Sequence, residues 1–464
     1  MAQLRLVLLL LAVAALGTPA RSAVYAAEPA QATPSEAPRY ELDIDVDTRA
    51  GRLTGQMTLD YTNRTGTTLR DIVLRMYANF LRDIFGDGGD VRMDVMNVRV
   101  NGTGVKVTLE AGSTAVRVPL PAPLAPGGEA RVELSWSTTI RPWQRSDGSF
   151  PLPSSYPMLA AWTGAWRTDV SRFPDRVFAT AATYRATIAV PEGMSVIAGG
   201  TTTSTRTADG KAIFEVTTGP VREFAFSVGR FAVERATHAD IGVNVYHKPG
   251  DGLDAAARLI ALHAAASLAV FGDRFGAYPY GELDFHLINA RRGFDIGAEF
   301  PGLIVILVNG KHTAETRFVT AHEVAHQWWY GVVGNDIFRE PWIDEAFAQW
   351  SALLVEEHFA GAAAAERVYQ QQVVRLAQRT KAGCGLPINA YGSWNAYYAA
   401  VYGRGAQFLY TLRRELGDRA FFAGLRQYYA DNTFGIGTTA EVRAALEQSS
   451  RRDLAAMFRT WTGQ

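Results

Sequence analysis

The sequence of 464 residues contains a single cysteine, Cys384, so no disulfide can form within the chain. We interpret Cys384 as a small, partly buried residue rather than a reactive thiol. Lysine is also scarce, at five residues against a Lys+Arg total of 46, and the formal net charge is zero. This balance gives no reason to expect nucleic acid or an anionic membrane surface as a partner. Stability must come from a hydrophobic core, for which the chain is long enough.

Long apolar runs are absent beyond the first residues of the chain. Leu6–Leu16 is an unbroken apolar run that follows one basic residue and precedes Gly17 and Pro19, a pattern typical of a secretory signal peptide. We expect residues 1–27 to be that signal peptide and residues 28–37 to be a linker. The mature protein is then expected to be secreted, or held in the periplasm or cell envelope, without stable membrane insertion. An uncleaved anchor is the alternative.

Alternation of apolar and polar residues dominates the next part of the sequence. Residues 40–47 alternate without a break, and residues 53–61 resume the pattern after a turn at Ala50 and Gly51. A period of two predicts a β-hairpin with one buried face. Similar short segments recur between turn residues: 105–109, 115–118, 130–136, 184–190, 212–216 and 223–228. Residues 38–234 are therefore predicted to form an antiparallel β domain of the saddle or sandwich type.

The pattern changes near residue 235, where helical composition begins. Strand-like apolar segments are confined to 283–289 and 303–308. Helices are predicted at 251–272, 317–330, 344–359, 362–379, 403–416, 419–429, 438–448 and 453–461. Thr438 and Glu441 have the spacing of a capping box. Residues 235–464 are therefore predicted to form an α+β domain, which makes the chain multidomain.

One motif in the second domain carries chemistry. His322-Glu323-Val-Ala-His326 lies within a predicted helix, where residues four apart share a face. Both imidazoles can then bind one Zn²⁺ ion, and Glu323 can lie beside the attacking water as a general base. A surface helix that carries these residues by chance is the alternative. The apolar flanks argue against it, because a polar trio in an apolar helix needs a partner and a metal supplies one.

A third ligand is expected from a second helix. Glu345 follows His326 with eighteen residues between them, which leaves room for a loop and a helix start. Pro341 and the residues after it supply that start, with Asp344 as the expected cap. Glu345 would then project from a rigid helix toward the first one.

At these residues the chain resembles the aminopeptidase N and leukotriene hydrolase family of zinc peptidases, the gluzincins. The motifs that carry the resemblance are HEVAHQWW at 322–329, VVGNDIFREPWIDEAFAQW at 332–350, FGAYPY at 275–280 and YGRGA at 402–406. The resemblance implies a thermolysin-like α+β zinc peptidase domain behind the β domain. It also implies a short bacterial-type member that lacks the family's C-terminal helical domain.

The resemblance implies roles for individual residues. Glu345 would be the third ligand of a single Zn²⁺ ion, beside His322 and His326. Tyr402 would donate a hydrogen bond to the oxyanion that forms when water attacks the carbonyl, since a fixed donor beside the metal stabilises that charge. Other tyrosines close in sequence stay open as alternatives: Tyr391, Tyr397 and Tyr398.

The resemblance also implies a substrate-binding strand with Gly297, Ala298 and Glu299, in which Glu299 pairs with the free α-amino group of a peptide. The sequence departs from the family pattern here, with Ala298 where methionine is usual and Phe300 where asparagine or tyrosine is usual. We therefore predict a zinc aminopeptidase, with a zinc endopeptidase or another zinc hydrolase with an open cleft as the alternative. A binding protein with a relic site is a third hypothesis. Peptides are the expected substrates, and a monomer is expected.

Overall fold

The structure is a computed structural model that describes residues 37–80, 92–140, 148–173, 177–289, 295–309 and 314–463. The predicted signal peptide lies outside the described residues, as does the predicted linker up to residue 36. Both stay predictions.

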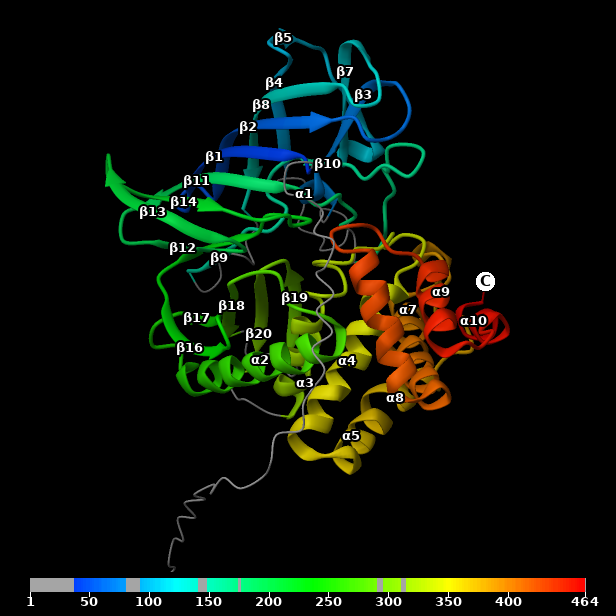
Figure 1. The fold of residues 1–464 in the computed structure, drawn as a ribbon. Helices are drawn as coiled ribbons and strands as arrows, with labels where there is room; N and C mark the ends of the chain where they lie inside the picture. The colour runs from blue at the N-terminus through cyan, green and yellow to red at the C-terminus, as the bar shows by residue number, and fades with distance from the viewer. Residues whose placement is uncertain are drawn as a thin grey trace, which may run out of the picture. The chain divides into compact units, whose positions relative to one another are not determined.

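The largest sheet among the described residues has eight strands (Figure 1). Their order across the sheet is β13 (Thr201–Ala208), β14 (Lys211–Thr217), β11 (Thr183–Pro191), β1 (Arg39–Asp47), β2 (Arg52–Thr62), β8 (Glu129–Thr139), β4 (Met93–Val100) and β5 (Thr103–Gly104). The predicted hairpin is confirmed, with Leu42 opposite Met57 in an antiparallel pair. The sheet is not antiparallel throughout, however, because β1 and β11 pair in parallel. These strands are far apart in sequence, so no tight turn forces them to run in opposite directions.

Two smaller sheets complete what we call the β-rich part, the strands before β16. One has the order β10 (Met158–Leu159), β3 (Leu69–Arg75), β7 (Ala115–Leu124) and β6 (Thr108–Glu110), and the helix α1 (Tyr77–Phe80) follows β3. The other has the order β12 (Ser195–Ala198), β15 (Phe226–Gly229) and β9 (Phe150–Pro151). The strand predicted from residue 223 begins only at Phe226. Arg222 and Glu223, just before it, are buried and polar, and they bond to residues outside any ladder.

The second half of the chain contains a five-stranded sheet in the order β16 (Ala232–His238), β17 (Ile241–His247), β18 (Glu282–Asn289), β20 (Leu303–Val308) and β19 (Ile296–Phe300). The predicted domain boundary after residue 234 falls within β16, and the division into domains stays a prediction. Helices α2 (Asp254–Phe275) and α3 (Ala314–Ala325) both pack on this sheet and contact each other, so they share one face (Figure 1). Helix α2 has the length and hydropathy of a membrane span, and half of its most apolar window is buried within the fold.

The remaining elements are helical. Apart from the 3₁₀ turns Ala111–Ser113 and Ile388–Ala390, they are α4 (Trp342–Ala360), α5 (Ala362–Tyr369), a π-helical turn (Gln370–Val374), α6 (Arg375–Ala377), α7 (Trp394–Tyr398), a second π-helical turn (Ala399–Gly405), α8 (Ala406–Asp431), α9 (Thr439–Ser450) and α10 (Ala455–Thr462). Helix α8 contains a kink at Gly417, where φ is 73°, which matches the predicted break between two helices. The predicted capping box of Thr438 and Glu441 is confirmed at the start of α9.

Helix α4 is buried over most of its length. Every residue from Trp342 to Glu356 is buried, and Trp342 and Trp350 are among the largest fully buried side chains. A helix that is packed on all sides has little freedom to move, so it is a rigid support for a site. Cys384 is also buried, and burial raises the pKa of its thiol to about 12, which agrees with an unreactive core residue.

Candidate metal centre

Helix α3 carries the first part of the predicted site. It ends at Ala325, before the predicted end at Tyr330, because the amide of Gly331 donates five residues back to the carbonyl of His326 and closes a wider turn. The amide of His326 still donates to the carbonyl of His322, at 3.3 Å, so one helical turn separates the two histidines. Their Nε2 atoms lie 3.1 Å apart. The spacing of four thus places both imidazoles on one face, as the sequence predicts.

Glu345 lies in the first turn of α4 and points at this pair of imidazoles. Its Oε2 atom is 3.3 Å from Nε2 of His322 and 3.4 Å from Nε2 of His326. Burial opposes ionisation of Glu345, but the two histidines outweigh it and hold its pKa below the ordinary value. Burial also lowers the pKa of His322, which favours the neutral imidazole that a metal requires. The structure therefore brings together the three ligands that the sequence predicts.

The three ligand atoms fit a tetrahedral metal ion. Zinc bonds of 2.0–2.1 Å place the ligands of a tetrahedron about 3.3 Å apart, close to the three separations in this site. The Oε2 atom of Glu345 is also buried without a hydrogen-bond partner among the described residues, although it faces two imidazoles. An ion between these atoms would satisfy that oxygen. The donor set of two imidazoles and one carboxylate is typical of catalytic zinc, which keeps a fourth position open.

Asp344 holds His326 from the other side of the ring. Its Oδ1 atom lies 2.6 Å from Nδ1 of His326, and the carbonyl oxygen of Trp329 lies 3.1 Å from the same nitrogen. Two acceptors assign the proton to Nδ1, so the Nε2 lone pair faces the metal position. The prediction that Asp344 caps α4 is wrong, because Pro341 is the N-cap and Asp344 already lies inside the first turn. In the sequence, only its position next to Glu345 indicates that Asp344 could take part in the metal site.

Glu323 follows His322 directly, and one of its carboxylate oxygens lies within 4.8 Å of a ring nitrogen of His326. It is buried, and its Oε2 atom has no hydrogen-bond partner among the described residues. Burial raises its pKa well above the ordinary value, and the nearby carboxylate of Glu299 raises it further. A carboxylate with a raised pKa takes up a proton more readily at neutral pH, which suits a general base. Gly297 approaches it so closely that an added Cβ atom would lie 2.1 Å from the carboxylate carbon of Glu323.

Strand β19 brings the predicted substrate residues to the site. It pairs antiparallel with β20 on one side and is the edge strand of its sheet among the described residues, so its other side can pair with an extended peptide. Glu299 is partly buried, and carboxylate oxygens of Glu299 and Glu323 and a ring nitrogen of His326 lie within 4.8 Å of one another. Burial raises the pKa of Glu299 to about 7. Ala298, between Gly297 and Glu299, is partly buried.

Gln327, which was not predicted from the sequence, connects β19 to the end of α3, which we call the metal helix because it carries His322. Its side-chain oxygen accepts from the amide of Gly302 at 2.8 Å, and its side-chain nitrogen donates to the carbonyl of Phe300 at 3.1 Å. The turn after β19 is thereby fixed relative to the residue that follows His326. The position of Glu299 depends on a contact that comes from a different element.

Tyr402 lies in the second π-helical turn, and its ring stacks on the imidazole of His322 with a centroid distance of 6.0 Å and an interplanar angle of 9°. Short π-helical turns inside longer helices are frequent at functional sites. The turn packs closely on its neighbours: a Cβ atom at Gly405 would lie 2.5 Å from Cβ of Ala346, and one at Gly403 would meet the backbone of Ala377. Gly405 therefore lets this turn approach α4, which carries Glu345, and Gly403 lets it approach α6.

The other tyrosines considered from the sequence differ in their placement. The hydroxyl of Tyr391 shares its one hydrogen between the backbone carbonyls of residues 383 and 384, at 2.8 and 2.9 Å, so it is already engaged. Tyr397 is fully buried, and its ring stacks on an aromatic ring of the β-rich part. Tyr398 lies with its ring 4.5 Å from that of Tyr402. The stacking on His322 favours Tyr402 over the other three tyrosines, and Tyr398 is its neighbour.

Comparison with known proteins gives one family for this part of the chain. Residues 268–461 match the peptidase family M1 domain. The alanine/arginine aminopeptidase of Saccharomyces cerevisiae is 27% identical over 259 residues, which cover 51% of this chain and 29% of the yeast protein. Aminopeptidase N of Lactococcus lactis is 27% identical over 202 residues, which cover 39% of this chain and 23% of that protein. The chain spans less than a third of the length of these two relatives.

Solved structures extend the similarity to nearly the whole chain. The M1 zinc metallopeptidase of Deinococcus radiodurans superposes with a TM-score of 0.69 at 22% identity, covering 92% of this chain and 93% of that chain. A mutant M1 zinc metallopeptidase from the same organism, bound to a Tyr-Ser-Ala substrate, gives a TM-score of 0.70 at 22% identity and covers 92% of this chain and 94% of that chain. At this identity the likeness shows the fold, which includes the β-rich part.

Proposed function

We propose that this chain, whose residues 268–461 match the peptidase family M1 domain, is a zinc-dependent metallopeptidase that removes N-terminal residues from peptides. The observation that carries the proposal is the convergence of the ligand atoms of His322, His326 and Glu345 on one point, with the carboxylates of Glu323 and Glu299 beside it. The carboxylate of Glu323 suits chemistry at the scissile bond, and the carboxylate of Glu299 suits recognition of an amine. The named relatives, the aminopeptidases of yeast and Lactococcus lactis, support this reading.

Each residue of the pocket has a distinct task in peptide hydrolysis. A bound zinc ion would polarise the scissile carbonyl and make water more acidic. Glu323, with its raised pKa, accepts the proton of the attacking water and later delivers it to the leaving amine. Tyr402, beside His322, donates a hydrogen bond to the developing oxyanion. Asp344 keeps the proton of His326 on Nδ1 throughout.

Glu299 and the edge of β19 decide which bond is cut. An extended peptide can pair with the free side of β19, which orients its backbone along the strand. Its positively charged α-amino group would lie against the carboxylate of Glu299, close to Glu323. An amine anchored this close to the base leaves room for one residue before the scissile bond. The geometry therefore favours removal of single N-terminal residues.

The test compares matched peptides that differ only in an acetyl group on the N-terminus. The full chain is expected to bind one zinc ion, to lose activity on chelation, and to cleave the free peptide at its first bond while leaving the acetylated peptide intact. Cleavage of both peptides at internal bonds would instead show an endopeptidase or another zinc hydrolase. A protein that binds no zinc and cleaves neither peptide would contradict the proposal altogether.

A further inference from the structure

Two consecutive side chains of the β-rich part reach into the loop that follows the metal helix. Arg222 is buried at 2% exposure and bonds to backbone carbonyls rather than to a carboxylate. Its Nε atom donates to the carbonyl of Tyr330 at 2.7 Å, and its Nη2 atom donates to the carbonyls of Val332, at 2.9 Å, and Gly435. Burial lowers the pKa of Arg222 to about 10, so the guanidinium stays charged at neutral pH.

Glu223, the next residue, holds the side chain of the same tyrosine. Its Oε1 atom accepts from the hydroxyl of Tyr330, and its Oε2 atom accepts from the hydroxyl of Ser154 at 2.7 Å. Glu223 is 1% exposed, so both contacts lie away from water. Hydrogen bonds to a buried carboxylate are among the stronger ones in proteins. Tyr330 is therefore held at its carbonyl and at its hydroxyl by neighbouring residues of one segment.

Tyr330 needs such support because its backbone is strained. Its φ angle is 114°, a conformation that a bulky residue adopts only when the surroundings impose it. Its amide donates to the carbonyl of Val333 at 2.8 Å, which closes the loop from the other side. The peptide bond before this residue carries the carbonyl of Trp329, one of the two acceptors of His326 Nδ1. The strained residue thus sets the direction of an oxygen that contacts a metal ligand.

The loop is shaped to receive the guanidinium. A Cβ atom at Gly334 would lie 2.2 Å from the central carbon of Arg222, so only glycine fits at that position. The amide of Gly334 donates to the carbonyl of Gly435, and the amide of Gly437 donates back to the carbonyl of Gly334. The guanidinium therefore connects the loop after the metal helix to the loop after α8. Because this contact requires glycine at position 334 and bonds to both loops, it is more specific than a chance contact between two surfaces.

We infer that Arg222 and Glu223 are positioning residues of the metal centre: they hold Tyr330 in its strained conformation, so that the carbonyl of Trp329 stays on His326 Nδ1. The β-rich part then acts on the affinity of the site without contributing a ligand. This inference rests on the proposed function, because it concerns the zinc site of that function. It predicts that changes at Arg222, Glu223 or Tyr330 weaken zinc binding although none of them touches the metal position.

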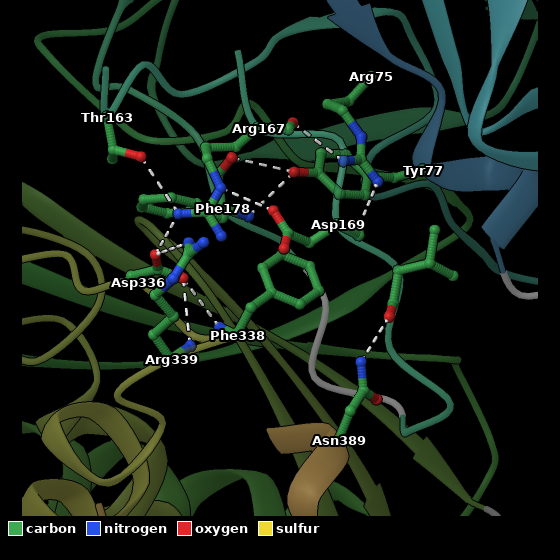
Figure 2. A network of polar contacts seen from close by, with 11 residues as sticks. Arg75, Tyr77, Thr163, Arg167, Asp169, Phe178, Asp336, Phe338, Arg339 and Asn389 are labelled. Atoms are coloured by element: carbon green, nitrogen blue, oxygen red, sulfur yellow. Dashed lines mark hydrogen bonds and ion pairs between the residues drawn. The ribbon is translucent and has the colours of Figure 1, made fainter. Parts of the chain in front are cut away.

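The variants to test are Tyr330→Phe, which removes one hydroxyl, and Arg222→Lys, which keeps the charge but loses the fork of donors. Glu223→Gln is the third variant, for the case that Arg222→Lys does not fold. The β-rich part offers two matched controls, which Figure 2 shows. The buried Arg75 donates to the carbonyls of Arg167, at 3.0 Å, and Asp169, at 2.8 Å. The hydroxyl of the buried Tyr77 donates to the carbonyl of Phe178 at 3.0 Å. Arg75→Lys and Tyr77→Phe are the corresponding control substitutions.

The main measurement is the zinc dissociation constant of each full-length variant, from competition with a chelator. Two further measurements are kcat and KM of the zinc-saturated protein and the thermal unfolding of the metal-free protein. Tyr330→Phe and Arg222→Lys are expected to raise the zinc dissociation constant about 10-fold or more, as loss of a partner of a ligating histidine does. They should lower kcat with little change in KM. The control variants should lose thermal stability to a similar degree and keep the zinc affinity of the unaltered chain.

The outcomes separate this inference from the proposed function. If the unaltered chain binds zinc and cleaves peptides but both test variants bind zinc as tightly as the controls do, Arg222 and Glu223 serve stability alone and the inference is wrong. If the controls lose zinc affinity to the same degree as the test variants, the effect is general and the inference is again wrong. If the unaltered chain binds no zinc, the proposed function fails, and the inference fails with it.

Discussion

The Nδ1 atom of His326 and the Oδ1 atom of Asp344 lie 2.6 Å apart, and both residues are buried. Asp344 belongs to the same helix turn as Glu345, so one segment supplies both a candidate ligand and the acceptor that orients another candidate ligand. A displacement of α4 would therefore affect two of the three ligands at once. The relative positions of the candidate ligands therefore depend on the rigidity of α4.

The first prediction concerns this pair. Asp344→Asn replaces an acceptor carboxylate by an amide and weakens the hold on the Nδ1 proton, so the zinc dissociation constant should rise about 10- to 100-fold. Chelator competition measures it. The control is Asp251→Asn, since Asp251 lies 3.0 Å from Nδ1 of the buried His247, away from the metal ligands. An Asp344→Asn variant with unchanged zinc affinity would show that the contact is not needed for metal binding.

The second prediction concerns the general base. Glu323→Gln should keep a full complement of zinc, because Glu323 is not one of the three converging ligands, yet kcat should fall at least about 100-fold. Metal analysis and steady-state kinetics on one preparation give both readings. Glu356→Gln is the control. Like Glu323, Glu356 is a buried glutamate, but it lies on α4 and its Oε1 atom pairs with Nε of Arg317 at 2.9 Å. The control variant should keep its activity, and activity retained by Glu323→Gln would contradict the mechanism.

The third prediction concerns recognition of the amine. Glu299→Gln removes the charge that faces the α-amino group, so kcat/KM for peptides with a free N-terminus should fall about 10- to 1000-fold, the range that loss of a buried charged partner gives. Any residual cleavage of acetylated peptides should change much less, because they carry no charge at that end. Equal losses on both kinds of peptide would remove the argument for an aminopeptidase.

The fourth prediction concerns stability and pH, at a site remote from the metal ligands. Burial raises the pKa of Asp284 to about 8 from its ordinary 3.8, although Asn244 donates to it at 2.9 Å and lowers it somewhat. Between about pH 4 and pH 8 the unfolded chain loses this proton and the folded chain keeps it, so stability falls as pH rises. Asp284→Asn should therefore stabilise the metal-free protein at pH 8 and have little effect at pH 4, as measured by urea unfolding.

The control for that prediction has the opposite sign. A hydrogen bond from Arg131 lowers the pKa of Asp60, so its contribution to stability is present above its ordinary pKa and is lost as the pH falls. Asp60→Asn should destabilise the protein at neutral pH, and that difference should shrink in acid. If both variants responded to pH in the same direction, the assignment for Asp284 would be wrong.

Local spacing accounts for what the sequence alone predicts well. The hairpin of β1 and β2 follows from a period of two, and the capping box of α9 follows from residues three apart. The pair His322 and His326 follows from a spacing of four on a helix, whatever the rest of the fold does. These features depend on a few covalently linked neighbours, so the sequence shows them directly.

The sequence alone was less accurate where neighbours in space are not neighbours in the chain. It extended α3 to Tyr330, assigned Asp344 as a cap, and predicted an antiparallel β domain in which the parallel pair of β1 and β11 was not expected. The end of α3 depends on a turn that the β-rich part holds in place, which no local pattern reports. The parallel pair of β1 and β11 depends on the sheet as a whole.

The sequence by itself therefore determined which residues are the candidate metal ligands and the candidate base, because their spacing and residue types already favour that chemistry. Only the tertiary structure decided how these groups are held. Asp344, Gln327 and the Arg222–Glu223 pair act through contacts between separate elements, and a contact between elements leaves no periodic trace in either segment. The physical reason is that helix and strand patterns record which side of an element is buried, and not which partner covers it.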